Sequence, residues 1–323
     1  MKTAILLLSL SITVQAQPQR LRNARVETRK AEGNLAAQVL QIAAAQDEPA
    51  WLGYQVESVP RHFGGCDVDL EGSNRVQLEP SRELYVFYRM AARKIERVRT
   101  LSPDCEIDAG GVTVYWLTGV RAAQSIALLE SLVNDHTNSA IAAIAMHSDA
   151  AADTALDRLI ATDKPENVRR QTAFWMGNAR GRHGYEVLVR VLRQDPSDNV
   201  REHAIFALTQ SKEPDAIKTI IAAAHDDRSA RVRGQALFWL AQKAGKQIAA
   251  TEIAASIERD PETEVKKRAV FALTQIPNGD GVPQLIQVAR TNRNAEVRKR
   301  AMFWLGQSKD PRALKFFEEV LSR

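Results

Sequence analysis

The second half of the chain repeats itself with a nearly constant period. A Val-Arg or Val-Lys dipeptide recurs at spacings of 32, 32, 33 and 32 residues, beginning at Val168, Val200, Val232, Val265 and Val297. An internal period in this range is typical of proteins built by stacking one small structural unit. One such unit cannot bury its apolar surface alone, so the period predicts an array in which neighbouring units share a core.

Other residue types keep a fixed distance from this valine. The position five residues before it is Asp in four copies and Asn292 in the last copy. The position six residues after it is always Phe, and the position ten after it is always an amide. The position seven after it alternates between Trp and Ala, which predicts that large and small side chains of neighbouring units interdigitate.

Each unit is predicted to contain two helices. One carries the Val-Arg column, and the other is an amphipathic segment such as residues 185–193 or 282–290. Pro or Gly marks the joins between the two helices. A degenerate earlier copy fits residues 123–161, and residues 311–321 form a half-repeat that closes the array.

This pattern resembles the HEAT repeat, in the short bacterial form that is also grouped with the bilin-lyase-like HEAT proteins. The resemblance lies in the Asp–x4–Val-Arg–x2–Ala core and the Leu that follows, as in residues 195–208, and it covers residues 121–323. It implies a right-handed α-solenoid of about six helix pairs, in which the Val-Arg helix is second in each pair and lines the concave side. It does not imply one function, because HEAT arrays serve many tasks.

Residues 17–120 do not contain the repeat. One helix is predicted at residues 35–45. Four segments rich in β-branched and aromatic residues predict strands, at residues 51–56, 83–90, 95–101 and 112–117. We therefore expect a small α+β domain with an antiparallel sheet at residues 17–120, followed by the solenoid at residues 121–323.

Residues 1–16 have the pattern of a signal peptide. Lys2 precedes an apolar stretch at residues 4–14, which is shorter than the roughly 20 residues that a membrane-spanning helix needs. Val14 and Ala16 place small residues where a signal peptidase cuts. We expect cleavage after Ala16 and a periplasmic or secreted protein without stable membrane insertion. The alternative is a buried N-terminal helix.

The two cysteines, Cys66 and Cys105, lie in the same predicted domain. An exported protein permits a disulfide between them, which would stabilise the fold by about 4 kcal/mol in the chain-entropy model. Two free thiols are the alternative. A metal site is not expected, because only His62 lies near Cys66 and no second pair has metal-ligand spacing.

Two sets of columns are candidates for binding. The Asp and Arg columns either bind a charged ligand or pair with each other, within one repeat or between neighbouring repeats. The Phe and amide columns fall at about 240° and 280° from the valine on a helical wheel, opposite the expected core. This side predicts an aromatic ribbon for a protein or extended peptide, formed by Phe174, Phe206, Phe238, Phe271, Phe303, Gln210, Gln242, Gln275 and Gln307, with Lys267, Arg268, Lys299 and Arg300. In the alternative, each Phe fills the groove between repeats and the amides cap helix ends.

No catalytic residue, metal site or cofactor site is expected. The chain has no His-Glu dipeptide, no nucleophile elbow, no P-loop and no dinucleotide fingerprint, and its six histidines share no repeat column, so lone surface histidines are expected. A net charge of +5 with acidic residues interspersed, on an exported chain, argues against a nucleic-acid partner. The predicted function is a non-enzymatic protein-binding scaffold or adaptor of the cell envelope. The alternative is a bilin-lyase-like enzyme or enzyme accessory factor.

Overall fold

The computed structural model describes residues 17–60, 81–134 and 138–322. The chain divides into two compact units, Met1–Ala155 and Leu156–Arg323. The predicted domain boundary after residue 120 stays a prediction. Among the helices in the described ranges, none is both long enough and apolar enough to cross a membrane.

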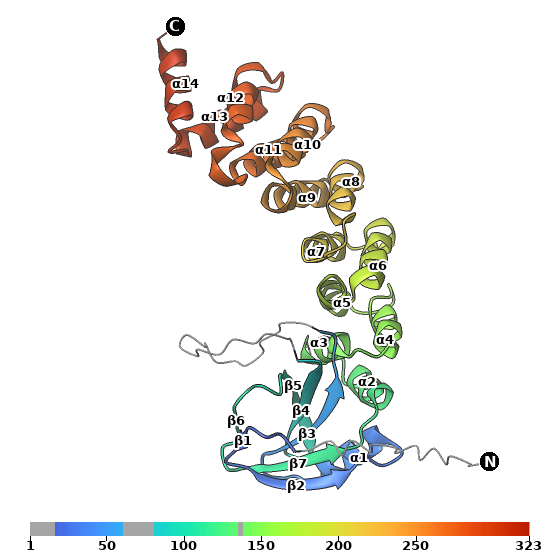
Figure 1. Ribbon diagram of the computed structural model, residues 1–323. Helices are drawn as coiled ribbons and strands as arrows, with labels where there is room; N and C mark the ends of the chain where they lie inside the picture. Colours follow the sequence, from blue (N-terminus) through green and yellow to red (C-terminus); the bar gives the residue numbers. More distant parts are fainter. Residues whose placement is uncertain (1–16, 61–80, 135–137, 323) are drawn as a thin grey trace, which may run out of the picture. The chain divides into compact units, whose positions relative to one another are not determined.

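The first unit is built on a mixed five-stranded sheet (Figure 1). In sheet order its strands are β2 (Arg25–Lys30), β7 (Thr113–Thr118), β3 (Ala50–Glu57), β4 (Glu83–Ala91) and β5 (Lys94–Leu101). β2 and β3 both run parallel to β7, whereas β3, β4 and β5 form an antiparallel meander. The expectation of an antiparallel sheet is therefore wrong for half of the sheet.

One error is that the predicted strands β3 and β7 pair in parallel. The other is β2, which was not predicted and adds a second parallel pair. Its sequence, Arg-Val-Glu-Thr-Arg-Lys, has one apolar residue, and all its other positions are exposed because it is an edge strand. Charged side chains are usual on such edges, since they discourage pairing with another chain. The helix α1 (Leu35–Ala44) connects β2 to β3, and the short strands β1 (Leu21–Arg22) and β6 (Ile107–Asp108) form a separate parallel pair.

Both faces of the three central strands, β7, β3 and β4, are largely buried. On one face Tyr85, Phe87, Val114 and Trp116 form an aromatic cluster. Three further helices of this region are α2 (Ala122–Ser131), α3 (Asn138–Met146) and α4 (Ala151–Leu159).

A second, polar network is fully buried in the first unit. Tyr54 Oη lies 2.5 Å from Tyr88 Oη and 2.7 Å from Ser125 Oγ, and Ser125 Oγ lies 2.9 Å from His147 Nε2. His147 Nδ1 lies 2.7 Å from the carbonyl oxygen of Ala143, so Nδ1 is the donor there. The expectation of surface histidines is therefore wrong for His147, which is 0% exposed.

The second unit consists of two rows of helices (Figure 1). The Val-Arg column lies on α5 (Glu166–Ala179), α7 (Asp198–Leu208), α9 (Ala230–Lys243), α11 (Thr263–Thr274) and α13 (Ala295–Gln307), each packed on the next. The other row is α6 (Gly181–Gln194), α8 (Ala216–Asp226), α10 (Lys246–Arg259), α12 (Val282–Thr291) and α14 (Pro311–Leu321). A short 3-10 turn, η1 (Pro277–Gly279), precedes α12.

The Asp column ends one helix and starts the next. Asp195, Asp227, Asp260 and Asn292 are the first extended residues after α6, α8, α10 and α12. Each of these side chains then accepts a hydrogen bond from the backbone N–H two residues further on, at 2.8–3.0 Å. This turn reverses the chain into the following Val-Arg helix. The predicted fold class, a mostly helical array preceded by a small α+β part, is confirmed.

Candidate functional site

The Arg and Asp columns form a ladder that runs between neighbouring repeats. The Nε atoms of Arg169, Arg201 and Arg233 lie 2.9, 2.9 and 2.7 Å from the carboxylates of Asp195, Asp227 and Asp260, respectively. A second N–H of each guanidinium reaches the other carboxylate oxygen, at 3.0–3.1 Å. Each pair is bidentate and buried, so the prediction of paired columns is confirmed, and each arginine pairs with the next repeat.

The guanidinium groups of Arg201 and Arg233 also donate to backbone carbonyl oxygens. Arg201 Nη1 donates to the carbonyl oxygen of Asp195, and Arg233 Nη1 donates to that of Asp227, both at 2.9 Å. The guanidinium groups therefore donate both to the carboxylates and to the carbonyl oxygens of the turns. The Arg–Asp ladder holds the repeats together and is not a binding surface.

The fourth position of the ladder is different. Here Lys266 replaces Arg and Asn292 replaces Asp. Lys266 Nζ donates to the carbonyl oxygen of Glu258 at 2.9 Å, and the Asn292 side-chain amide donates to the Glu258 carboxylate at 3.1 Å. Lysine cannot make the bidentate contact of arginine, so the ion pair is replaced by separate hydrogen bonds.

The five phenylalanines of the Phe column form a continuous series of ring contacts with Trp239 and Trp304, which we call the aromatic ladder. Its centroid distances run from 4.9 to 6.3 Å along Phe174, Phe206, Trp239, Phe238, Phe271, Trp304 and Phe303. Phe174 stacks on Phe206 with an interplanar angle of 19°, and Phe238 on Phe271 with an angle of 7°. Aromatic pairs of this kind contribute about 0.5–1.5 kcal/mol beyond their buried area.

The alternation of Trp and Ala sets the register of the aromatic ladder. Trp239 lies 4.9 Å from Phe206 of the preceding repeat, and Trp304 lies 5.0 Å from Phe271. These contacts alternate with the Phe–Phe stacks, which bridge the other repeat junctions. The predicted interdigitation of large and small side chains is confirmed.

Packing between repeats does not cover the aromatic ladder completely. Phe174, Phe206, Phe238 and Phe271 are half-buried, and Phe303 is 50% exposed. The two interpretations of the Phe column are thus both partly met, because the rings fill the grooves between repeats and keep one edge accessible. Whether that edge binds a partner stays a prediction, as does its place on a concave face.

The amide column lies at the C-terminal ends of the same helices. Gln210 donates to Thr209 Oγ1 at 2.8 Å and Gln275 to Thr274 Oγ1 at 2.9 Å. Both threonine hydroxyls donate in turn to a carbonyl oxygen of their own helix. Gln242 and Gln307 are exposed. The column therefore includes two amides tied to helix ends and two accessible to solvent.

The predicted basic residues differ in how far they are neutralised. Lys267 Nζ lies 2.6 Å from the Glu264 carboxylate and 3.5 Å from that of Glu296. The hydrogen bond to Glu264 raises the pKa of Lys267 and outweighs the small effect of burial. Arg268, Lys299 and Arg300 have no carboxylate within ion-pair distance among the described residues.

Arg300 and Arg268 contact other residues of the Val-Arg helices. The Arg300 guanidinium lies 5.7 Å from the Phe303 ring centroid and 5.4 Å from that of Trp304. Arg268 donates to the carbonyl oxygen of Arg231 at 3.3 Å, and its side-chain carbons lie against Gly234. These cations therefore border the exposed end of the aromatic ladder.

One contact within the Val-Arg helix row was not predicted from the sequence. Arg170 donates to His203 Nε2 at 3.0–3.2 Å, and His203 Nδ1 lies 2.9 Å from the carbonyl oxygen of Asn199. Burial lowers the pKa of His203, so its ring stays neutral and accepts from the arginine. The repeat alignment could have indicated this contact. Arg170 and Gly234 both lie two residues after the repeat valine, and the residues they contact, His203 and Arg268, both lie three residues after the valine of the next repeat.

The cysteine and metal expectations concern the first unit. Cys105 is buried, and its predicted partner Cys66 lies outside the described residues, so their pairing stays a prediction. In the described part of the chain, no three His, Cys, Asp or Glu side chains gather closely enough to hold a metal ion.

Comparisons with known proteins address the repeat directly. The CpcE–CpcF complex of phycocyanin lyase from Nostoc sp. PCC7120 is 21% identical, over 58% of this chain and 76% of that chain, with a TM-score of 0.32. Human deoxyhypusine hydroxylase in complex with glycerol is 16% identical, over 61% of this chain and 85% of that chain, with a TM-score of 0.27. Both TM-scores are too low to support an argument about activity.

No curated protein matches the chain. The family model for HEAT repeats matches residues 152–241 and 250–323, which together are more than half of the sequence. The matched residues include every Val-Arg helix and the Arg–Asp ladder. The chain therefore belongs to the HEAT-repeat family.

Proposed function

We propose that the chain is a non-enzymatic scaffold or adaptor that binds a protein or extended peptide along the aromatic ladder. The observation that carries this proposal is the accessible edge of the ladder, which continues through five stacked helices to the half-exposed Phe303. Rigid aromatic rings supply contact area at low cost in conformational entropy, and for this reason they dominate binding hot spots.

The charges beside the ladder favour an acidic partner segment. Arg268 and Arg300 border its C-terminal part, and Lys299 is an exposed cation on the same helix as Arg300. None of the three has a carboxylate partner among the described residues, whereas Lys267 is already paired. A partner's carboxylates would complete these contacts, and exposed amides such as Gln242 and Gln307 can bind its backbone. The partner segment we propose therefore combines acidic residues with apolar side chains that lie on the rings.

The proposed location is the cell envelope. It rests on the sequence of residues 1–16 alone, with cleavage after Ala16. N-terminal sequencing of the protein isolated from periplasm or culture medium tests it, because a protein beginning at Gln17 supports export and one retaining Met1 contradicts it.

Binding is tested with the full chain as bait in an envelope extract. The first variant is the triple change Arg268→Gln, Lys299→Gln and Arg300→Gln, which removes three exposed charges without touching the core. Its matched control is Arg190→Gln, Arg259→Gln and Lys315→Gln, three exposed cations on the other helix row. The proposal predicts that the captured partner is lost with the first triple variant and kept with the control.

A second pair of variants tests the rings themselves. Phe238→Ser and Phe271→Ser are expected to lose the partner with a modest fall in melting temperature. A collapse of folding in both variants, together with unchanged capture by the charge variant, would contradict the proposal. It would show that the aromatic ladder serves packing alone.

The bilin-lyase-like alternative rests on the sequence resemblance only. It predicts a chromophore-binding protein or an accessory of an enzyme that handles one. Visible absorbance of the chain purified from its native envelope would favour this alternative over the scaffold.

A further inference from the structure

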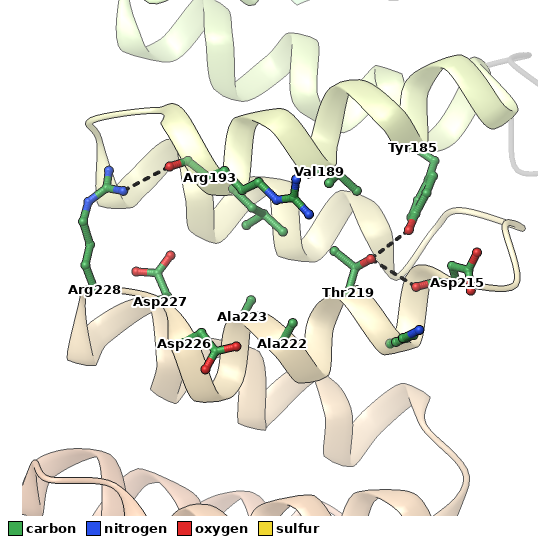
Figure 2. A pocket seen from close by; sticks show the side chains of 12 residues that line it. Tyr185, Val189, Arg193, Asp215, Thr219, Ala222, Ala223, Asp226, Asp227 and Arg228 are labelled. Atoms are coloured by element: carbon green, nitrogen blue, oxygen red, sulfur yellow. Dashed lines mark hydrogen bonds between the residues drawn. The ribbon is translucent and has the colours of Figure 1, made fainter.

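The helices α6 and α8 enclose a groove with a volume of about 630 Å³ (Figure 2). Its lining comes from these two helices and the turn after α8, whereas the aromatic ladder belongs to the other row of helices. The groove is therefore a separate surface from the one proposed above.

The walls of the groove are held by hydrogen bonds. At one end Tyr185 Oη lies 2.9 Å from Thr219 Oγ1, which donates to the carbonyl oxygen of Asp215 at 3.1 Å. At the other end Arg228 donates to backbone carbonyl oxygens, among them that of Arg193 (Figure 2). The groove is open because α8 places the small side chains of Ala222 and Ala223 between these ends.

Two other pairs of neighbouring helices in this row, α8 with α10 and α12 with α14, are bridged by a contact between a basic side chain and a carboxylate. The residue two positions before the Asp column supplies the cation or histidine. His225 Nε2 lies 2.9 Å from the Glu252 carboxylate, which joins α8 to α10. Arg290 pairs with Glu319, which joins α12 to α14. Between α6 and α8 the described residues form no bridge from this position, and the groove lies there.

Arg193 occupies this position on α6, but α8 lacks the carboxylate. No corresponding position of α8 is acidic. Glu319, counted from Arg290, corresponds to Ala222; Glu252 corresponds to Ile220 when counted from His225 and to Thr219 when aligned on the Asp column. Of these three positions, Thr219 and Ala222 line the groove. Among the described residues no carboxylate lies within ion-pair distance of Arg193, and the same is true of Lys218, the second cation of the groove.

We infer that this groove binds a short acidic and apolar peptide segment of a partner protein, whose carboxylate takes the place of the missing bridge at Arg193. An adjacent apolar side chain fits over Ala222 and Ala223, and Lys218 donates to a second carboxylate or to the peptide C-terminus. The span from residue 218 to residue 226 is about 12 Å of helix, which an extended peptide covers with about four residues.

The acidic residues at the ends of the groove restrict the ligand further. Asp215 and Asp226 carry no ion-pair partner among the described residues and line opposite ends of the groove. They disfavour a long polyanion, because its charges would lie beside these carboxylates. The groove therefore selects one or two acidic residues within an apolar segment, and not a nucleic acid.

A random hexapeptide library displayed on phage, panned on the immobilised full chain, tests this inference. The expected result is a set of binders with Asp or Glu beside Leu, Ile or Phe. A fluorescein-labelled binder then gives dissociation constants by fluorescence anisotropy. Arg193→Gln is expected to weaken binding about tenfold or more, which is the effect of losing one charge-assisted hydrogen-bonded pair.

Ala222→Glu is the sharper variant, because it supplies the missing carboxylate from α8 itself. It is expected to abolish binding and to raise the melting temperature slightly, which separates occlusion of the groove from unfolding. Arg190→Gln, an exposed arginine on the same helix outside the groove, is the matched control and is expected to change binding less than twofold. Lys299→Gln with Arg300→Gln should also leave it unchanged, because those residues lie beside the aromatic ladder.

Each of the following results would overturn the inference. One is the absence of any saturable binder from the library. Another is a set of binders without enrichment in Asp or Glu. The third is equal affinity for a binder and its Glu→Gln counterpart, or for the wild type and Ala222→Glu. If binding is instead lost in the Lys299 and Arg300 variant, the selected peptides occupy the aromatic ladder, and the groove is not their site.

Discussion

Removal of one carboxylate from the Arg–Asp ladder should destabilise the second unit strongly. The perturbation is Asp227→Ala, which leaves the Arg201 side chain, 0% exposed, without its bidentate partner. Two guanidinium contacts at 2.9 and 3.0 Å are lost, as is the hydrogen bond from the Ser229 N–H at 2.8 Å. Burial lowers the pKa of Arg201, and the hydrogen bonds and charges of Asp227 and Asp198 together raise it by more.

The expected magnitude follows from this geometry. Breaking a buried ion pair by removing one partner costs about 3–5 kcal/mol. For a unit of this size that corresponds to a fall in melting temperature of about 6–20 °C. The change should be smaller for Asp227→Asn, because an amide keeps the turn hydrogen bond, as Asn292 does. Replacing both partners, with Arg201→Met and Asp227→Leu, should restore much of the loss, since no charge then remains buried.

Thermal unfolding followed by circular dichroism at 222 nm measures these effects. The matched control is Asp226→Ala, which removes the neighbouring exposed carboxylate and is expected to change stability by less than about 0.5 kcal/mol. The reasoning would be refuted if Asp227→Ala and Asp226→Ala had the same melting temperature. It would also be refuted if the double replacement were less stable than Asp227→Ala alone.

Three further predictions concern other parts of the chain. Gly177→Ala should cost about 1–3 kcal/mol in thermal unfolding, because its Cβ would lie 2.2 Å from the Ala207 carbonyl oxygen, whereas Gly245→Ala meets nothing within 4 Å and should be neutral. Tyr54→Phe should cost about 1–3 kcal/mol, since the Tyr54 hydroxyl joins Tyr88 to Ser125 in a buried network, and a melting temperature equal to wild type would contradict this role. Burial raises the pKa of Tyr54 to about 12, above the roughly 10 of the unfolded chain. The contribution of Tyr54 to stability should therefore be fully present below pH 10 and be lost as the pH rises from 10 to 12, which melting curves measure. Tyrosinate absorbance at 295 nm that showed Tyr54 ionising near pH 10 in the folded chain would contradict this.

The features that the sequence predicted are those repeated at a fixed spacing. Val200, Arg201 and Phe206 recur with the same local geometry in each unit, so their columns identify the helices, the paired charges and the interdigitating rings. The direction of pairing could not be predicted, because an arginine can reach an Asp of its own or of the next repeat. The choice is made by the turn that places Asp227 beside the preceding repeat.

Features that depend on long-range contacts were not accessible in this way. β2 has the composition of a charged loop, and only its pairing with β7 makes it a strand. His147 is buried through contacts with Ser125, which is 22 residues away in the chain. The groove between α6 and α8 depends on small side chains such as Ala222, which in sequence are indistinguishable from ordinary helix core. The half-burial of the Phe column likewise depends on neighbours in adjacent repeats.

Hydroxyl-radical footprinting of the full chain, with and without the partner captured from the envelope, tests the proposed function most directly. Met302 is 38% exposed and Phe303 is 50% exposed at the open end of the aromatic ladder, while Ile248 and Leu314 are 47% and 64% exposed on the other helix row. Binding along the aromatic ladder predicts that the partner lowers oxidation of Met302 and Phe303 several-fold and leaves Ile248 and Leu314 unchanged. Unchanged oxidation of Phe303 at a saturating partner concentration would contradict the proposal.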